Sequence, residues 1–246
     1  MAKSKTAPST KPHKVVSPKA WTTARKALLL KEKKFTQLRE QLAKARRALP
    51  WEKVEKEYVF DGPKGQETLA DLFAGKSQLI IYHFMFGPDW KEGCRGCSFW
   101  ADNFNGPGIQ LHLQQRDTTM LAVSRAPLPK LKAFQKRMGW NFKWVSSGRT
   151  DFNYDYGVSF HEKDLKKGPV TYNYAARKTD SEEMPGLSVF YRDKAGNIFH
   201  TYSSYARGLD MMNTVYQYLD LTPKGRDEDK LEFTMEWLDF HDRYKG

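Results

Sequence analysis

Two cysteines, the only ones in the chain, stand two residues apart as Cys94-Arg95-Gly96-Cys97. Residues i and i+3 on the first turn of a helix face the same side, and their Cα atoms then lie within the roughly 4.4–6.8 Å that a disulfide requires. A thiol at a helix N-terminus also faces free N–H groups, which favour the thiolate. The spacing therefore predicts a reversible dithiol, with Cys94 as the attacking thiol and Cys97 as the resolving thiol.

Charged residues and glycines around the pair are expected to tune it. Arg95 adds a nearby cation, which favours the thiolate, whereas Asp89 and Glu92 act in the opposite direction. Gly93 and Gly96 are expected to keep the approach to the sulfur open. The balance of these charges leaves the size of the pKa shift undecided at the level of sequence.

Trp90 and His83 are further candidates to line or tune the site. Each also fits a structural role: His83 as a hydrogen-bonded core histidine in a buried strand, and Trp90 as a cover over the loop. Two other interpretations of the cysteines stay open, namely a pair of inert buried thiols and a structural zinc site. Zinc needs four ligands, and candidates such as His83 and His112 show no paired spacing. No metal and no cofactor are therefore predicted.

The net charge is concentrated at the start of the chain. Residues 1–50 hold 14 Lys and Arg against 2 Asp and Glu, and the remaining 27 basic and 27 acidic residues balance. A neutral main domain offers no broad basic face, which argues against nucleic acid as a partner. The sequence contains no run of about 18 apolar residues, so no membrane span is predicted. Two cysteines do not make a disulfide scaffold, so a reducing, cytoplasmic location is expected.

The first 49 residues are expected to form a tail and a helix. Residues 1–16 are rich in Lys, Ser, Thr and Pro and predict a disordered basic tail. Over 17–49 the sequence predicts a long amphipathic helix, capped by Ser17 and stopped by Pro50. An apolar stripe recurs every seven residues, interrupted in its companion row by Lys31; its members are Trp21, Leu28, Phe35, Leu42 and Leu49. We expect this stripe to pack on the same chain or on a second copy, as a homodimer.

Strand and helix patterns alternate over 50–221. Strands are expected near 58–60, 78–86, 118–127, 141–147, 187–191 and 198–202, and helices near 69–75, 94–104, 128–140 and 207–221. The stretch 78–86 is nearly all apolar, which is typical of a central strand buried on both faces. Residues 222–246 are expected to form a C-terminal helical extension that packs on the domain.

This order resembles thioredoxin-like proteins, because the Cys-x-x-Cys directly follows a buried strand and Pro185 directly precedes another in "MPGLSVF". Longer motifs are "LPWEKVEKEYVF", "YHFMFGPDWKEGCRGCSFWAD", "WVSSGRTDFNYDYGVSF" and "LDLTPKGRDE". From about Pro18 to the C-terminus the chain resembles a bacterial family of unknown function, described as predicted dithiol–disulfide oxidoreductases. The resemblance implies an α/β thioredoxin-like mixed sheet and a cis-proline at Pro185 that shapes a groove facing the cysteines. It also implies protein or small-molecule disulfides or thiols as partners.

Two alternative functions remain at this stage. A peroxiredoxin-like peroxidase would carry Pro-x-x-x-Thr-x-x-Cys, but Pro88 stands six rather than seven positions before Cys94, and Lys91 occupies the Thr position. Arg125 is the cation that would partly substitute for the missing hydroxyl. The other alternative is a non-catalytic thioredoxin-like scaffold that acts through its basic N-terminal helix.

Overall fold

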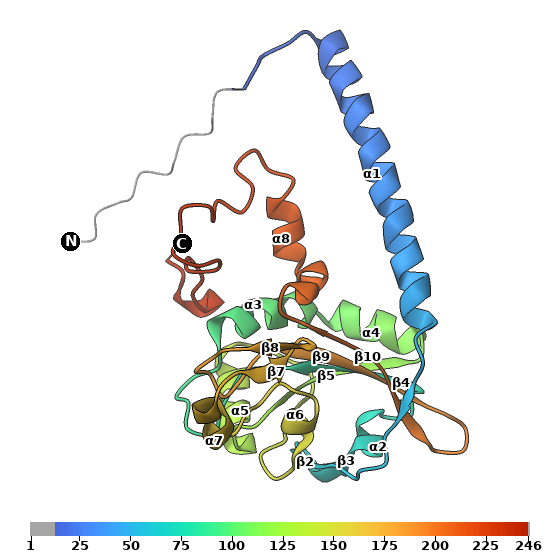
Figure 1. Cartoon of the computed structure of the whole chain (residues 1–246), viewed down its shortest axis with the longest axis vertical. Coiled ribbons are helices and arrows are strands. Elements are labelled where there is room, and N and C mark those ends of the chain that lie inside the picture. Colours follow the sequence, from blue (N-terminus) through green and yellow to red (C-terminus); the bar gives the residue numbers. More distant parts are fainter. Residues whose placement is uncertain (1–12, 246) are drawn as a thin grey trace, which may run out of the picture. The chain divides into compact units, whose positions relative to one another are not determined.

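The computed structural model describes residues 13–245 (Figure 1). The expectation of a disordered tail therefore falls mostly on residues outside the described part. The described residues form two compact units: one comprises residues 13–49 with 218–227, and the other comprises residues 50–217 with 228–245. The cysteines belong to the second unit.

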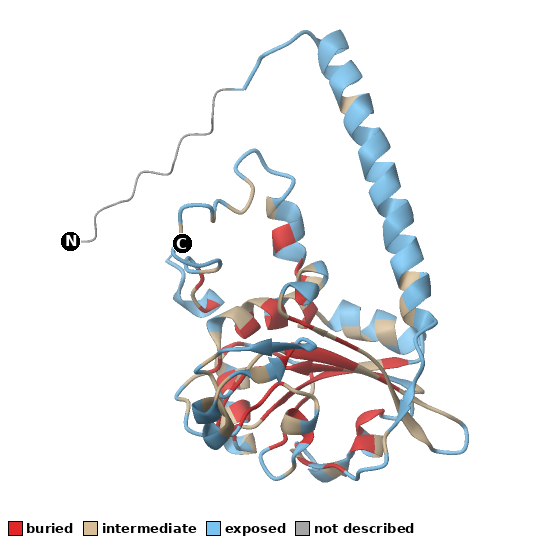
Figure 2. Ribbon diagram, in the orientation of Figure 1, coloured by how far each residue is buried: buried red, intermediate tan, exposed pale blue. Residues whose placement is uncertain are grey.

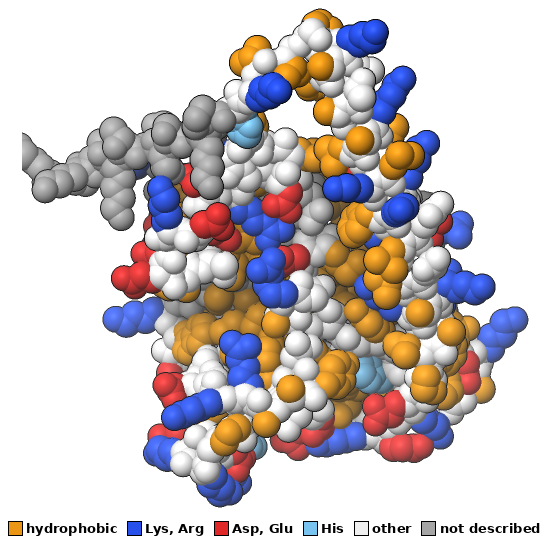
Figure 3. All heavy atoms as spheres, turned by 45° about the horizontal axis from the view of Figure 1, so that its top comes forward, with side chains coloured by type: hydrophobic (Ala, Val, Ile, Leu, Met, Phe, Trp, Pro, Cys, Tyr) orange, Lys and Arg blue, Asp and Glu red, His pale blue; other side chains and the backbone are white. Residues whose placement is uncertain are grey.

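The first unit contains the long helix α1 (Pro18–Arg47), as the sequence predicts. Its cap is Ser17, whose Oγ accepts a hydrogen bond from the Ala20 N–H at 3.3 Å. None of the residues of α1 is buried (Figure 2). The hydrophobic side chains of α1 lie next to Lys and Arg side chains on its surface (Figure 3). Trp21, Leu28 and Phe35 are each at least 51% exposed. No residue of α1 is buried within its own unit, and the expectation that the stripe packs on the same chain or on a second copy stays a prediction.

An eight-stranded sheet forms the second unit, in the order β1-β10-β9-β4-β5-β6-β2-β3. The central strands β4, β5 and β6 run parallel, and β9 pairs antiparallel with β4 and with β10. This arrangement confirms the thioredoxin-like α/β fold. The strands are β1 (Glu52–Lys53), β2 (Val59–Gly62), β3 (Gly65–Thr68), β4 (Gln78–His83), β5 (Thr118–Ser124), β6 (Trp144–Ser146), β9 (Gly186–Arg192) and β10 (Ile198–Tyr205).

Helices and one small hairpin cover the sheet, with α3 and α4 along one face in Figure 1. The cysteine-bearing helix α3 lies where it is predicted, whereas α4 and the hairpin β7–β8 are additions. The elements are α2 (Leu69–Leu72), α3 (Arg95–Phe104), α4 (Pro107–Gln115), α5 (Leu128–Arg137), α6 (Phe152–Asp155), α7 (Glu162–Lys167), β7 (Val170–Tyr172), β8 (Ala175–Arg177), the 3-10 helix η1 (Ala206–Met212), α8 (Thr214–Leu219) and the 3-10 helix η2 (His241–Arg243).

The C-terminal segment 228–245 differs from the expected helix. It consists of turns and the short η2, and its aromatic side chains anchor it instead. Phe240 is 2% exposed and its ring centroid lies 5.5 Å from that of Phe134 on α5. Asp242 forms an ion pair with Arg137 at 2.7 Å. Packing of individual side chains therefore fixes this segment, since no helical hydrogen-bond ladder does.

Alternation along β4 divides the core into two sides. Leu79 and Ile81 join one buried cluster, and the ring of His83 stacks on Phe152 of that cluster at 5.6 Å. Tyr82 points to the opposite face, where its ring lies 5.6 Å from Phe104 of α3. The face that carries Tyr82 is therefore the face on which the cysteines lie.

Candidate active site

Cys94 is the N-cap residue of α3, with extended backbone angles (φ −61°, ψ 133°). Its N–H donates to the Met85 carbonyl at 3.0 Å, and its own carbonyl accepts from the Ser98 N–H at 2.9 Å. The loop after β4 and the first turn of α3 therefore hold Cys94 from both sides. Its side chain is half-buried, whereas Cys97 is 2% exposed.

The two thiols are free and the cysteines lie 3.9 Å apart. The Cys97 N–H donates to the Cys94 sulfur at 3.5 Å. The Met85 N–H donates to the Cys97 sulfur at 3.4 Å. Met85 thus contacts both cysteines through its backbone, because its carbonyl binds Cys94 and its N–H binds Cys97.

The pKa of Cys94 is lowered to about 7. The main cause is the hydrogen bond from the Cys97 thiol, and the backbone N–H groups of Cys97 and Gly96 add to it, while burial opposes them. Each donor favours the charged sulfur over the neutral thiol. At neutral pH Cys94 therefore carries a substantial thiolate fraction.

The pKa of Cys97 is raised well above that of an ordinary thiol, chiefly by burial and then by its hydrogen bond to Cys94. The Tyr82 hydroxyl is hydrogen-bonded to the Cys97 side chain and opposes this rise. The pKa of Tyr82 itself is raised by burial and by the nearby cysteine. The two sulfurs therefore have opposite properties: Cys94 favours the thiolate, and Cys97 remains a protonated donor.

A cavity of about 400 Å³, called the cysteine cavity below, opens beside both sulfurs. Its walls come from β4, α3, the β7–β8 hairpin, the segment before β9, η1 and the C-terminal segment. The residues that line it are Tyr82, Met85, Cys94, Gly96, Cys97, Trp100, Tyr172, Arg177, Met184, Pro185, Ala206, Arg207, Leu209, Asp210 and Met235.

Pro185 lies where the sequence predicts it, in the wall of the cysteine cavity directly before β9. The expectation of a cis bond is wrong, because none of the peptide bonds in the described part of the chain is cis. The Pro185 carbonyl accepts a hydrogen bond from the Tyr172 hydroxyl at 2.7 Å. The added hairpin β7–β8, which carries Tyr172, therefore holds the proline segment in its extended course.

Arg95 and Trp90 lie close to the cysteines in sequence but do not line the cavity. Arg95 Nε is 3.5 Å from Asp239 Oδ1, so its charge is directed to the C-terminal segment. The Trp90 ring covers Gly87, where an added Cβ would lie 2.9 Å from the indole. Trp90 thus covers the loop after β4, which was the structural role considered for it as an alternative to lining the site.

His83 is a core residue on the other side of the sheet. Its Nε2 lies 2.9 Å from the Ser188 hydroxyl, and burial lowers its pKa to about 3, so the ring is neutral. The reason for its position is the two-residue period of β4, which places Tyr82 and not His83 on the cysteine side. The hydrogen-bonded core histidine is therefore the interpretation that fits.

Arg125 is also directed away from the cysteines. Its guanidinium pairs with Glu183 and with Glu182, at 3.2 Å for the latter, and contacts the Tyr154 hydroxyl. Glu183 is 1% exposed, which makes this a buried charge pair. Arg125 does not line the cysteine cavity and is not placed to replace the missing peroxide-orienting hydroxyl.

The two glycines beside the cysteines have different roles. A Cβ on Gly93 would lie 2.6 Å from the Phe84 ring, so Gly93 is required for packing rather than for access to sulfur. A Cβ on Gly96 would lie 3.7 Å from the Cys94 sulfur and 3.8 Å from Met235 Sδ, which are ordinary contacts. A side chain at Gly96 would therefore contact both sulfurs without a clash, whereas a side chain at Gly93 would clash with the Phe84 ring.

Several residues of the cavity were not identified from the sequence, among them Tyr172, Arg177 and Met235. They are 75 or more positions from the cysteines, and no motif connects them. Tyr172 and Arg177 lie on the β7–β8 hairpin, an addition to the predicted sheet.

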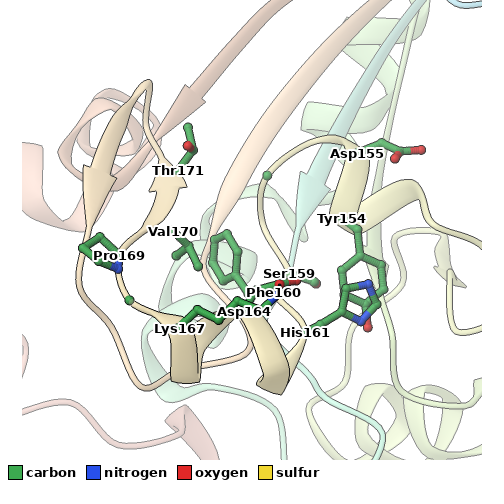
Figure 4. A pocket seen from close by; sticks show the side chains of 12 residues that line it. Tyr154, Asp155, Ser159, Phe160, His161, Asp164, Lys167, Pro169, Val170 and Thr171 are labelled. Atoms are coloured by element: carbon green, nitrogen blue, oxygen red, sulfur yellow. Dashed lines mark hydrogen bonds and ion pairs between the residues drawn. The ribbon is translucent and has the colours of Figure 1, made fainter.

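A second cavity of about 640 Å³, called the Tyr154 cavity below, lies between α6, α7 and β7. Figure 4 shows the rings of Tyr154 and His161 face to face, and their centroids lie 4.1 Å apart. Charged side chains line it, including Asp155, Asp164 and Lys167. It contains no cysteine, and none of the sequence-predicted site residues lines it.

Two general features of the described residues bear on the site. Among residues 13–245, no helix has both the length and the apolarity required to cross a bilayer. In the same part of the chain, no three His, Cys, Asp or Glu side chains gather as a metal ion would require.

The family of this chain follows from its sequence. Residues 10–244 match the family described as "Bacterial protein of unknown function (DUF899)". The chain belongs to this family. The match spans almost the whole chain, including the cysteine motif and every wall of the cysteine cavity, and it agrees with the resemblance seen in the motifs. No curated protein matches this family member.

Solved structures resemble the chain more distantly. Peroxidoxin BcpB from Mycobacterium tuberculosis has a TM-score of 0.44 at 10% identity, covering 68% of this chain and 96% of that one. A peroxiredoxin Q from Xanthomonas campestris has 0.44 at 16% identity, covering 66% and 89%. A putative thiol:disulfide interchange protein DsbE from Chlorobium tepidum has 0.40 at 16% identity, covering 69% and 94%. These likenesses are weak, and the fold assignment rests on the strand order of the sheet.

Proposed function

We propose that the protein is a dithiol–disulfide oxidoreductase in which Cys94 attacks and Cys97 resolves. The observation that carries the proposal is the asymmetry of the two sulfurs. Cys94 caps α3 at the wall of a cavity, whereas Cys97 is buried behind it and donates to its sulfur. A helix-terminal sulfur with three donors is the arrangement that favours a thiolate nucleophile.

The reaction transfers two electrons from the protein to a disulfide. The Cys94 thiolate attacks one substrate sulfur, the substrate S–S bond breaks, and the first product leaves as a thiolate that takes up a proton. Cys97 then loses its proton and attacks the Cys94 sulfur of the mixed disulfide, which releases the second thiolate. The protein ends as a Cys94–Cys97 disulfide, and an external dithiol must reduce it for a further turnover.

Burial of Cys97 suits the resolving role. Its high pKa keeps it protonated while Cys94 is a thiolate, so it does not compete for the substrate. When Cys94 becomes part of a mixed disulfide, Cys97 is already 3.9 Å away. Tyr82, hydrogen-bonded to the Cys97 side chain, stabilises the thiolate that resolution requires.

Trapping experiments test the proposal directly. We expect Cys97→Ser to accumulate mixed disulfides through Cys94, and Cys94→Ser to accumulate none, as read by non-reducing electrophoresis and mass spectrometry. A protein whose thiols react only after denaturation would contradict the proposal. Fast oxidation of Cys94 by hydrogen peroxide, combined with no reaction toward disulfides, would instead favour a thiol peroxidase.

We also propose that α1 pairs with α1 of a second copy. Leu28, Phe35 and Leu42 are exposed on one face at seven-residue spacing, which is the pattern that interdigitates between two helices. Soluble monomers rarely leave so large an apolar patch uncovered. Leu28→Asp should then convert a dimer to a monomer in light scattering. Leu30→Asp, on the opposite face of the same helix, is the matched control, and a monomeric wild-type protein would contradict the pairing.

A further inference from the structure

Three segments line the cysteine cavity in addition to β4, α3 and the segment before β9. The β7–β8 hairpin contributes Tyr172, and η1 contributes Leu209. From the C-terminal segment, Met235 lines the cavity, and a Cβ on Gly96 would lie 3.8 Å from its sulfur and 3.7 Å from that of Cys94. Cys94 is only half-exposed at this wall. A disulfide on the surface of a folded protein would have to enter past these three segments.

The interior of the cavity is apolar and adaptable. Three methionines, Met85, Met184 and Met235, line it together with Trp100 and Leu209. Methionine side chains are flexible and polarisable, and they fit apolar groups of different shapes. A volume of about 400 Å³ lies in the range of pockets that hold small organic molecules.

Two arginines at the cavity add positive charge. Arg207 is compensated, because its Nε lies 2.9 Å from Asp210 Oδ2. Arg177 forms no ion pair with any residue in 13–245, and its guanidinium lies 5.8 Å from the Tyr172 ring. One uncompensated guanidinium beside an apolar cavity selects ligands that carry an anionic group.

We propose that the disulfide attacked by Cys94 belongs to a small organic molecule with an apolar body and an acidic group, and that Arg177 binds the acidic group. The inference rests on the proposed oxidoreductase function and specifies its substrate class. The apolar body lies among the methionines, with one sulfur next to Cys94. The electrons and protons follow the same two steps, so the product is two small thiols and the Cys94–Cys97 disulfide.

Four disulfide probes separate the contributions of charge, apolar body and size. Dithiobis(nitrobenzoate) has an aromatic body with a carboxylate, and dithiobis(nitropyridine) has an aromatic body without one. Oxidised glutathione is acidic without an apolar body, and insulin presents protein disulfides. Each rate is measured on the full-length Cys97→Ser protein, which stops after the first attack, and is divided by the rate of free N-acetylcysteine. We expect the aromatic carboxylate probe to have the largest ratio and insulin the smallest.

Two substitutions test the two halves of the cavity. Arg177→Gln should lower the preference for the carboxylate probe over the uncharged probe by up to about fivefold, the effect of an ion pair made by an exposed arginine. Arg116→Gln, an exposed arginine at the end of α4, is its control. Gly96→Leu should slow both aromatic probes, because it adds a bulky side chain to the cavity wall against the sulfurs of Cys94 and Met235. Gly108→Leu, at a helical glycine with nothing within 4 Å, is the matched control.

The outcomes separate this inference from the proposed function. If insulin reacts as fast as the aromatic probes, or if neither Arg177→Gln nor Gly96→Leu changes the preferences, the substrate class is wrong while the disulfide chemistry stands. If Cys94 reacts with none of the four probes in the folded protein, the oxidoreductase function is itself overturned. The expected pattern, in which Arg177→Gln lowers the preference for the carboxylate probe and Gly96→Leu slows both aromatic probes, supports the small acidic disulfide.

Discussion

The Tyr154 cavity and the cysteine cavity differ in chemical character, and their volumes do not predict this difference. The Tyr154 cavity is the larger, at about 640 Å³ against about 400 Å³. Charged side chains and one histidine line it, and His161 is stacked on Tyr154 (Figure 4). The cysteine cavity is lined mainly by apolar side chains, but the first turn of α3 directs backbone N–H groups at Cys94.

The comparison shows that the hydrogen-bond donors around a group, more than the volume of a cavity, produce a reactive group. In the cysteine cavity the main donor to the Cys94 sulfur is the Cys97 thiol, and N–H groups that α3 leaves unpaired at its start add to it. In the Tyr154 cavity, Ser159 is the residue closest in type to a nucleophile. Its hydroxyl donates to the buried carboxylate of Glu183 at 2.8 Å, which stabilises the protonated form.

The largest expected effect comes from moving the thiol between the cavities. Cys94→Ser should lower the rate of disulfide attack at pH 7 by at least about a hundredfold, because the thiolate is the nucleophile. Adding Ser159→Cys to that variant should not restore the rate, since a thiol beside Glu183 has a raised pKa. The measurement is release of the coloured thiol from dithiobis(nitrobenzoate). Recovery in the double variant would show that any thiol in either cavity suffices.

The pH profile of Cys94 gives the next largest effect. With a pKa of about 7, its alkylation rate should reach half its maximum near pH 7. Below that point the thiolate fraction falls, so the rate should drop about tenfold for each pH unit, and above it the rate should level off. Cys97→Ala removes the thiol donor and should move the midpoint to higher pH. Cys97→Ser keeps a hydrogen-bond donor and should move the midpoint less. If Cys97→Ala and the wild-type protein have the same midpoint, the Cys97 thiol does not lower the pKa of Cys94.

Glycines near the two cavities should differ in their stability effects. Gly93→Ala places a Cβ against Phe84 and Phe134 and should lower the free energy of unfolding by about 1–3 kcal/mol. Gly157, beside the Tyr154 cavity, has φ +64° and no atom closer than 3.8 Å to an added Cβ. Gly157→Ala should cost about 1 kcal/mol through its backbone angle, and Gly157→Asn less, because Asn tolerates that region. Urea unfolding measures all three, and a larger loss for Gly157→Asn than for Gly157→Ala would contradict the conformational argument.

The smallest effect is expected from the stacked pair of the Tyr154 cavity. His161→Phe keeps an aromatic ring over Tyr154 and removes the ring nitrogens. We expect the rate of Cys94 with disulfides to stay within about twofold, since no described contact joins the two cavities' polar groups. A tenfold change in that rate would show that the Tyr154 cavity belongs to the same functional site.

The sequence by itself determined the parts of this protein that depend on neighbours along the chain. The buried strand that begins at Gln78, the helix start at Cys94 and the i, i+3 spacing of the thiols are local patterns that the structure has, although β4 ends at His83 and not at residue 86 as predicted. The Ser17 cap and the end of α1 are also local, since a side-chain acceptor and a proline act within one helical turn. The family motifs, which are distributed along the chain, predicted the thioredoxin-like fold.

Tertiary structure alone decided which distant residues meet the sulfurs. Side chains alternate between the two faces of β4, so Tyr82 lies beside Cys97 and His83 lies on the other side of the sheet. The sequence pattern does not say which of the two faces α3 covers. Arg95 is adjacent to Cys94 in the chain but pairs with Asp239. Arg177 and Met235 reach the cavity only because a hairpin and an irregular C-terminal segment pack over α3. Contacts between segments 75 or more residues apart depend on how whole elements pack, and local propensity does not predict them.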